Sequence, residues 1–451
     1  MLFLDQLIIA IGNWAYWLLI SKLTSTAQIG DATTIYSLVV LAATLSELGL
    51  EYPLLKKSST HSSQILVSAL IIELVLVAAA VPIVIYFITH IYEDRLHDFA
   101  WIAGATLIAL PIGFVSSFLL LGKLEAKRIL MIDTIGVCIK FFFGYVLVVI
   151  GLGATGLLIS FLIYAIFIAS VTFTLAKRKV GFNLPESRFI RETFMAGLSN
   201  IPSKLSRMFI FSLSVVLLAS FGISSSDIGI FYIALMISIV VGGLFSSIAY
   251  MIIPTSSMSE RDLSFDTIRI GISLTALIVA AIVASPKTVL LLVGKEYIQA
   301  EAILLVLSIG ILPFAIVENA ISKFNYLNKP RILLFVGFIQ LLSFLVSFLI
   351  LVPYFGTLGA AFSIITGLIA SAIVSIFWLE RALIRYIINS GISIVLGWIT
   401  GYIFLLVSAG DLVDQIAAMV SSMIVALISV IALKNTSVSE IKHLIKTMVS
   451  S

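Results

Sequence analysis

The chain has 451 residues, of which 61% are hydrophobic and only 11% are charged, and its net charge is +4. Soluble globular proteins carry about 25% charged residues, so this composition excludes a soluble enzyme or binding domain, and the small net charge predicts no nucleic-acid partner. The single cysteine, Cys138, excludes an internal disulfide and a cysteine-based metal site. The composition therefore predicts an integral membrane protein.

Apolar stretches long enough to cross a bilayer follow one another along the whole chain. A span needs about 20 mainly apolar residues, and it must be helical because unpaired peptide groups are too costly in lipid. The sequence predicts an all-α polytopic membrane protein with about fourteen transmembrane helices. The predicted spans are 2–20, 32–54, 65–88, 100–121, 131–150, 155–176, 193–219, 228–252, 266–293, 301–325, 332–352, 358–380, 390–408 and 413–433. The first begins apolar and lacks a basic leader, so we expect a retained span rather than a signal peptide.

Lys and Arg residues are distributed unevenly between the loops. With the N-terminus placed in the cytoplasm, 19 of the 27 fall in cytoplasmic segments, four in outer segments and four within spans. Positively charged loops stay on the cytoplasmic side, so we predict cytoplasmic N- and C-termini. After the last span, Val438, Ile441 and Leu444 recur at helical spacing, which predicts a cytoplasmic amphipathic tail at 435–451. A frayed tail is the alternative.

Part of the first half of the chain matches the second half at an offset of 203 residues. The matching positions are Arg128-Ile129-Leu130 and Arg331-Ile332-Leu333, Gly153 and Gly356, and Gly156 and Gly359. Each copy reads as a basic cytoplasmic turn, a span, a tight Gly-x-x-Gly turn and another span. A unit of six spans preserves orientation, so the halves would be parallel repeats. We predict six-helix lobes at 1–180 and 181–385 and two additional helices at 386–434.

Three cations fall near the middle of predicted spans. Lys140 lies in the fifth span, and Lys204 and Arg207 lie in the seventh. A cation at the bilayer centre costs about 2.5–3.5 kcal/mol on insertion scales, and binding an anion such as a lipid phosphate or pyrophosphate would offset that cost. We expect these residues to bind an anionic head group, the alternative being ion pairs with buried carboxylates or snorkelling. Lys323, near the end of the tenth span, is expected to snorkel.

Acidic residues in spans are candidates for ion coupling. Glu47 and Glu51 are four residues apart in the second predicted span and would share a helix face. Two nearby carboxylates repel each other when both are ionised, which suits proton coupling; ion pairs with Lys204 or Arg207 are an equal alternative. Glu73 and Glu318, in the third and tenth spans, complete the candidate set.

Some sequence patterns match motifs found in enzymes, but they lack the surrounding structure that those motifs need. The segment Gly151–Gly156 satisfies G-x-G-x-x-G, but it lies in a turn between two spans and no βαβ unit surrounds it. No P-loop is present, and the four histidines all lie outside the predicted spans. Asn435-Thr436-Ser437 fits a glycosylation sequon but is placed in the cytoplasm. We therefore expect a protein that is not an enzyme and that has no cofactor and no metal site.

A set of short motifs occurs in an order and spacing typical of one transporter family. The motifs are Ser21-Lys22-Leu23-Thr24 through Ile29-Gly30, Tyr36-Ser37-Leu38, Leu48-Gly49-Leu50, Ile228-Gly229-Ile230-Phe231-Tyr232-Ile233-Ala234 ending at Pro254, Gly294-Lys295-Glu296-Tyr297, and the span-opening Gly156 and Gly359. In these features the chain resembles the polysaccharide transporter branch (the O-antigen flippase type) of the multidrug/oligosaccharidyl-lipid/polysaccharide flippase superfamily. It departs at Ser206, where the family often has Asp before the arginine, and by three extra residues between Gly30 and Tyr36.

The resemblance implies a flippase in the cytoplasmic membrane that moves a lipid-linked oligosaccharide or polysaccharide precursor by alternating access between two lobes. The implied partners are that lipid-linked glycan and membrane lipids, with glycan polymerases or glycosyltransferases as further candidates. One alternative is an ion-coupled multidrug or organic-cation antiporter of the related drug-extrusion branch. Such a carrier would present acidic groups to its substrate and usually has twelve spans, so the mid-membrane cations and two extra spans favour the flippase. A non-transporting scaffold of a glycan-assembly complex, with every buried charge paired, is the other alternative.

Overall fold

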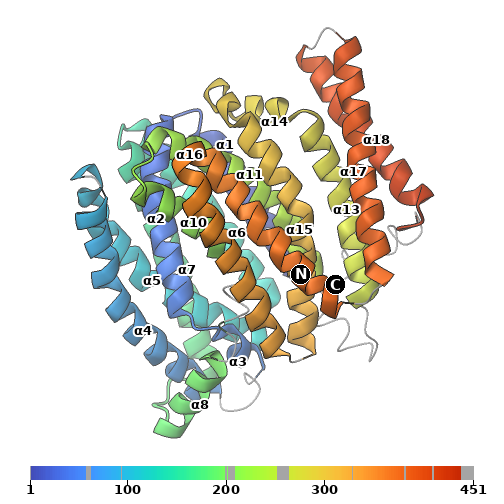
Figure 1. Ribbon diagram of the computed structural model, residues 1–451. Helices are drawn as coiled ribbons and strands as arrows, with labels where there is room; N and C mark the ends of the chain where they lie inside the picture. The colour runs from blue at the N-terminus through green and yellow to red at the C-terminus, as the bar shows by residue number, and fades with distance from the viewer. Residues whose placement is uncertain are drawn as a thin grey trace. The chain divides into compact units, whose positions relative to one another are not determined.

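The computed structural model describes residues 2–56, 62–92, 94–198, 201, 209–250, 264–327, 329–379, 382–408 and 411–437. Throughout these ranges the regular secondary structure is helical, which confirms the all-α prediction (Figure 1). The chain forms two compact units, Met1–Tyr232 and Ile233–Ser451. The predicted division into lobes at 180 and 385 stays a prediction.

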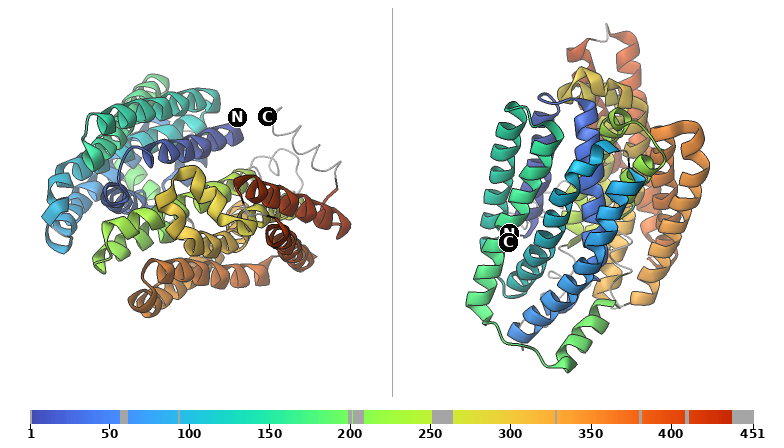
Figure 2. Two further views of the ribbon diagram at one scale, coloured as in Figure 1. Left: turned by 90° about the horizontal axis from the view of Figure 1, so that it is seen from above. Right: turned by 90° about the vertical axis from the view of Figure 1, so that its left-hand side faces the viewer.

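The first unit is a bundle of long apolar helices. Its helices are α1 (Leu2–Ile20), α2 (Thr26–Ser46), α3 (Glu51–Lys56), α4 (Ser62–Tyr86), α5 (Ala100–Gly122), α6 (Ala126–Val149), α7 (Gly153–Val180), α8 (Ser187–Leu198), α10 (Phe209–Ser220) and the first turns of α11 (Ser225–Tyr250). Helix α5 packs between α4 and α7, and α6 packs on α1 and α7. Buried side chains from α3, α4, α5 and α7, among them Leu54, Leu66 and Leu119, form one apolar core. Helix α8 crosses the end of α4 and packs Ile190 and Phe194 on that core (Figure 2).

The predicted second span, 32–54, is not one continuous helix. Helix α2 ends at Ser46, and Leu48 and Gly49 then take positive φ angles of 47° and 70° before α3 begins. Gly197 of α8 lies against this turn, because a Cβ there would be 3.0 Å from the Leu48 carbonyl oxygen. The turn separates Glu47, the C-cap of α2, from Glu51, the first residue of α3. The prediction that these two carboxylates share a helix face is therefore wrong.

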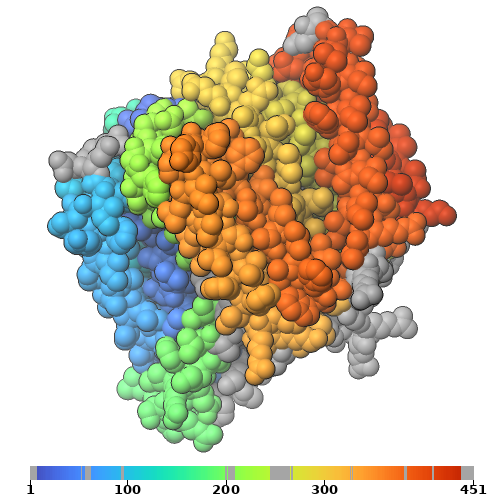
Figure 3. Space-filling model, in the orientation of Figure 1, coloured from blue at the N-terminus to red at the C-terminus, as the bar shows by residue number. Residues whose placement is uncertain are grey.

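The second unit contains a bent helix, a long hairpin and a C-terminal pair. Its helices are α13 (Ser264–Ala284), α14 (Pro286–Val293), α15 (Glu301–Tyr326), α16 (Pro330–Trp378), α17 (Ala382–Val407) and α18 (Leu412–Ala432), with the last turns of α11. The chain bends by 81° between α13 and α14, at Pro286, which opens α14 as a helix N-terminus allows. Helix α16 lies at the molecular surface (Figure 3) and exposes large apolar side chains such as Phe338 and Leu349, as a lipid-facing helix should.

The two Gly-x-x-Gly turns of the internal repeat have the same geometry. Gly153 and Gly356 both take positive φ angles, 48° and 53°, a conformation that favours glycine. The second glycine of each turn lies against the preceding helix: a Cβ on Gly156 would be 3.1 Å from the Leu147 carbonyl carbon, and one on Gly359 would be 2.5 Å from the Leu351 carbonyl oxygen. The prediction of two equivalent tight turns is confirmed.

The number of spans depends on how the broken helices are counted. By length and composition, ten helices within the described ranges could cross a membrane, or up to eleven if the bent α13–α14 pair is one span. That count takes α16 once, although its 49 residues would extend about 70 Å, more than two bilayer cores. The apolar stretches Ile8–Ile20 and Phe209–Ser220 are shorter. Each predicted span has a helical counterpart, and the figure of fourteen stays a prediction.

Small residues attach the C-terminal helix pair to the second unit. A Cβ on Gly397 of α17 would lie 2.9 Å from Ala280 Cβ, and one on Gly401 would lie 2.6 Å from Ala284 Cβ. Glycines four residues apart let transmembrane helices approach closely. Ser422 Oγ of α18 also donates to the Ala280 carbonyl oxygen of α13 at 2.8 Å. Helices α17 and α18 are thus packed on α13 rather than loosely appended.

Asn435, the first residue of the predicted cytoplasmic tail, belongs to the packed core of the second unit. It is fully buried, and its Nδ2 donates to Ser390 Oγ and to the Tyr386 carbonyl oxygen, each at 3.0 Å. A buried side-chain amide with these hydrogen bonds is not accessible for attachment of a glycan. Residues 438–451 lie outside the described residues.

Candidate functional site

Lys140 of α6 is buried inside the first unit, where aromatic rings surround its ammonium group. Its exposed fraction is 3%. Nζ lies 4.8 Å from the centroid of the Tyr16 ring, 5.5 Å from that of Phe161 and 5.7 Å from that of Tyr164, and it donates a hydrogen bond to Asn13 Oδ1. Helices α1 and α7 supply these partners. Ring faces attract cations by about 0.5–2 kcal/mol, which offsets part of the cost of burying the charge.

Among the described residues, Lys140 has no carboxylate as a counter-ion. Within the part of the chain that the structure describes, no carboxylate lies within 4 Å of Lys140 Nζ. The alternative that Lys140 pairs with a buried carboxylate is thus not what these residues show. An ammonium group in a low-dielectric site attracts anions strongly, so Lys140 remains a candidate ligand for a phosphate or pyrophosphate.

A network of aromatic contacts and one hydroxyl pair holds the Lys140 pocket in place. Tyr16 Oη and Ser160 Oγ are 2.9 Å apart. The ring of Tyr36 stacks on that of Phe161, with centroids 4.2 Å apart and planes 19° apart. Because Phe161 also contacts the Lys140 ammonium group, Tyr36 of α2 supports the ring that Lys140 packs against. The partners of Lys140 were not predicted from the sequence; the only local indication was an asparagine and a tyrosine three residues apart in the first span.

Lys204 and Arg207, the other two predicted head-group ligands, lie outside the described residues, and so does Ser206. The predicted seventh span, 193–219, is represented by the end of α8 and by α10. That these two cations bind the same head group as Lys140 stays a prediction.

The four candidate carboxylates have different environments. Glu73 in α4 is fully buried and Glu318 in α15 is 3% exposed, whereas Glu47 and Glu51 are half-buried at the α2–α3 turn. Glu73 belongs to the first unit and Glu318 to the second. Burial makes Glu73 and Glu318 the stronger candidates for ion coupling.

Lys323 does not snorkel as expected. It lies in the last turn of α15 and is only 6% exposed. Packing of α15 in the second unit encloses its long side chain instead of leaving it at the interface.

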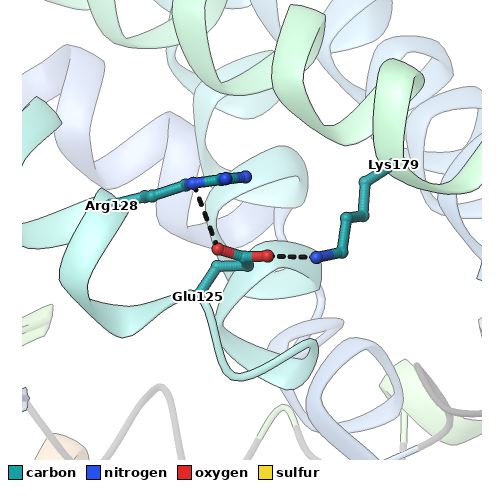
Figure 4. Close-up of polar contacts among 3 residues, drawn as sticks. All are labelled: Glu125, Arg128 and Lys179. Carbon is teal, nitrogen blue, oxygen red and sulfur yellow. Dashed lines mark hydrogen bonds and ion pairs between the residues drawn. The ribbon is translucent and has the colours of Figure 1, made fainter.

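An ion-paired cluster ties two helix ends together on the predicted cytoplasmic side of the first unit. Glu125, just before α6, accepts a hydrogen bond from Lys179 at the end of α7 and lies 3.3 Å from Arg128 Nε (Figure 4). The hydrogen bond from Lys179 and the charge of Arg128 hold the pKa of Glu125 below its usual value. The cluster fixes the ends of the hairpin that carries Lys140 and Phe161.

Comparison with known protein families identifies one family that matches the chain. A family model described as "Polysaccharide biosynthesis protein" matches residues 19–302, more than half of the chain. The chain belongs to this family. The match covers α2 to α14 and so includes the Lys140 pocket apart from the α1 residues. A search of curated proteins finds no match to this member of the polysaccharide biosynthesis family.

Solved structures of transporters share the fold of this polysaccharide biosynthesis protein. The lipid II flippase MurJ in an inward closed conformation aligns with a TM-score of 0.72 at 13% identity, covering 93% of this chain and 97% of the flippase. An inward-facing multidrug resistance MATE family transporter of the MOP superfamily aligns with a TM-score of 0.62 at 18% identity, covering 84% and 95%. A MOP superfamily transporter from Pyrococcus furiosus, whose description reads "Reverse polarity of binding pocket suggests different function", aligns with a TM-score of 0.56 at 16% identity, covering 86% and 94%. The chain therefore has the MOP fold, and the resemblance read from the sequence is confirmed.

Proposed function

We propose that the chain is a flippase that translocates a lipid-linked oligosaccharide or polysaccharide precursor across the cytoplasmic membrane by alternating access. The observation that carries the proposal is Lys140, a buried cation whose described surroundings contain no carboxylate. Family membership supplies the link to polysaccharide synthesis. The phosphate or pyrophosphate that joins glycan to lipid carries the charge that Lys140 would bind.

The two alternative functions fit the Lys140 pocket less well. A carrier of organic cations needs negative charge or π-faces free to meet its substrate, whereas the rings in this pocket already face a lysine ammonium. A scaffold whose buried charges are all paired would not leave a buried lysine without a carboxylate. Transport without chemistry on the glycan is the simplest role for such a site, and glycan polymerases or glycosyltransferases would act before or after it.

Neutralising Lys140 tests the proposal. The full-length protein in proteoliposomes, with a fluorescent polyprenyl-pyrophosphate oligosaccharide as probe, should lose translocation by roughly 10- to 100-fold in Lys140→Met, because a hydrogen bond to a charged group is worth about 1.5–3 kcal/mol. Arg207→Gln should have a similar effect. Lys127→Gln, which changes an exposed lysine at the start of the same helix, is the matched control. Normal translocation by a stable Lys140→Met protein would overturn the assignment.

We also propose that Glu73 or Glu318 couples transport to an ion gradient. Both carboxyl groups are buried in apolar helices, where a negative charge is costly unless a proton or cation compensates it. Replacement by Gln keeps the shape of the side chain and removes its titration. Collapse of the proton gradient should slow the unmodified protein and leave Glu73→Gln or Glu318→Gln unaffected; equal slowing in all three would eliminate both residues.

A further inference from the structure

Helix α8 lies at the end of the first unit where the spanning helices α4 and α7 stop (Figure 1). It packs on α4, and Asn183, in the link before it, donates from Nδ2 to Ser63 Oγ at the start of α4 at 3.4 Å. Helix α7 ends in the same region, at Val180, with three basic residues in its last turn. Both α4 and α7 are long and apolar enough to cross a bilayer, so their ends mark the membrane surface. Helix α8 therefore lies at that interface, on the side that the predicted topology makes cytoplasmic.

One face of α8 is fixed to the first unit. Thr193 is 3% exposed, and Ile190 and Phe194 pack on the apolar core formed by α3, α4, α5 and α7. A Cβ on Gly197 would lie 2.8 Å from Leu50 Cδ2, so this face also approaches the turn between α2 and α3 closely. These four positions recur at helical spacing, and the opposite face of α8 consequently points away from the core of the unit.

The opposite face of α8 carries two arginines followed by two apolar side chains. Arg188 and Arg191 are exposed, and so are Met195 and Leu198, by 52% and 45%. Their spacing of three, four and three residues puts all four in one row along the helix, which we call the α8 row. Arg188 Nε lies 2.8 Å from Glu192 Oε1, but both side chains are exposed, so solvent screens this pair. Arg191 forms no ion pair with any residue that the structure describes.

The α8 row matches the layered chemistry of a bilayer surface. Guanidinium groups bind phosphate through paired, charge-assisted hydrogen bonds, and side chains three residues apart on a helix are neighbours that can share one phosphate group. Apolar side chains of an interfacial helix enter the boundary between head groups and acyl chains. The ligand that fits the row therefore has an anionic head and apolar chains. A soluble anion would leave Met195 and Leu198 uncovered.

We propose that the α8 row is a binding site for an anionic phospholipid of the surrounding membrane. Arg188 and Arg191 bind the lipid phosphate, and Met195 and Leu198 contact its acyl chains. Because the other face of α8 packs on the α2–α3 turn through Gly197, a bound lipid also holds α8 against that turn. The site goes beyond the proposed function, since it involves neither the glycan nor Lys140.

Quenching by brominated lipids tests the site directly. In a Cys138→Ser background, the full-length protein with Met195→Cys is labelled with bimane and placed in phosphatidylcholine nanodiscs that contain acyl-brominated phosphatidylglycerol or acyl-brominated phosphatidylcholine at equal mole fractions. The anionic lipid should quench the label more strongly. Replacing Arg188 and Arg191 by Gln should weaken its apparent affinity about fivefold for each arginine, the effect expected of one basic residue at an anionic membrane surface.

The matched control removes two other exposed basic residues from the same end of the first unit. Lys127→Gln with Arg178→Gln should keep the difference between the two lipids. Equal quenching by both lipids, or an equal loss of the difference in the control and in the arginine variant, would overturn the site. Quenching by neither lipid would show that water or another protein covers the α8 row, and would overturn it as well.

The melting temperature of the unlabelled protein provides a second measurement. Phosphatidylglycerol added to the protein in detergent should raise the melting temperature of the unmodified chain and of Lys127→Gln with Arg178→Gln, because a ligand of the folded state stabilises it. It should raise that of Arg188→Gln with Arg191→Gln much less. Equal stabilisation of all three proteins would contradict the proposal. Neither measurement involves translocation, so failure of the flippase assignment would leave both outcomes unchanged.

Discussion

Single residues decide how charge is accommodated within each of the two units. Lys140 was identifiable from the sequence because a cation in an apolar stretch has few explanations. Its partners were not, since Asn13 and Phe161 are far from Lys140 in the chain and nothing local indicates that α1 and α7 meet α6 there. For Lys323 the prediction itself was wrong. Its position near a helix end predicted an exposed side chain, but tertiary packing buries it.

Glu125 should make part of the stability of the first unit dependent on pH. Because its folded-state pKa is lowered, its contribution is present above the ordinary pKa of a glutamate and is lost as the pH falls through the lowered value. The melting temperature of the unmodified protein should exceed that of Glu125→Gln near neutral pH. The difference should shrink toward acid, and a constant difference would contradict it. The effect is small, because exposed ion pairs are screened by solvent.

At the scale of helices, glycine positions carry more information than apolar patterning. The repeat indicated two equivalent turns, and Gly153 and Gly356 share a backbone conformation that other residues rarely adopt. Leu48-Gly49 divides the second span, because glycine readily takes the positive φ angle at which helices commonly end. Reading 32–54 as one helix put Glu47 and Glu51 on one face, and the turn separates them.

Substitution of Gly359 should destabilise the α16 hairpin. In Gly359→Ala the new methyl group would lie 2.5 Å from the Leu351 carbonyl oxygen, an overlap of the kind that costs about 1–3 kcal/mol. The melting temperature in detergent should fall clearly below that of the unmodified protein. Gly391→Ala in α17, which has nothing within 4 Å of the added Cβ, should melt at or slightly above the unmodified value. Equal melting of both variants would mean that the hairpin relaxes freely.

At the scale of the whole molecule, the distribution of basic residues predicts the orientation in the membrane. Asn183 lies in the exposed link between α7 and α8, and Asp411 caps α18. The predicted topology puts the first inside the cell and the second outside.

Single cysteines test this orientation. In a Cys138→Ser background, an impermeant maleimide should label Asp411→Cys in intact cells and Asn183→Cys only after permeabilisation. Reversed labelling would invert the topology. Labelling of both from the same side would show that the number of spans between them is even, against the seven predicted.

The sequence by itself determined that the chain is an all-α membrane protein, where its apolar stretches lie, that two of its turns are equivalent and which family it resembles. These properties are local or additive: an apolar stretch needs lipid whatever its neighbours are, and charges in loops can be counted without a fold. Only the tertiary structure decided that Lys140 sits among rings without a described carboxylate, that Glu47 and Glu51 lie on either side of a turn, and that Gly197 packs against that turn. Contacts between helices depend on their rotation and crossing, which an almost uniformly apolar sequence does not encode in any short stretch.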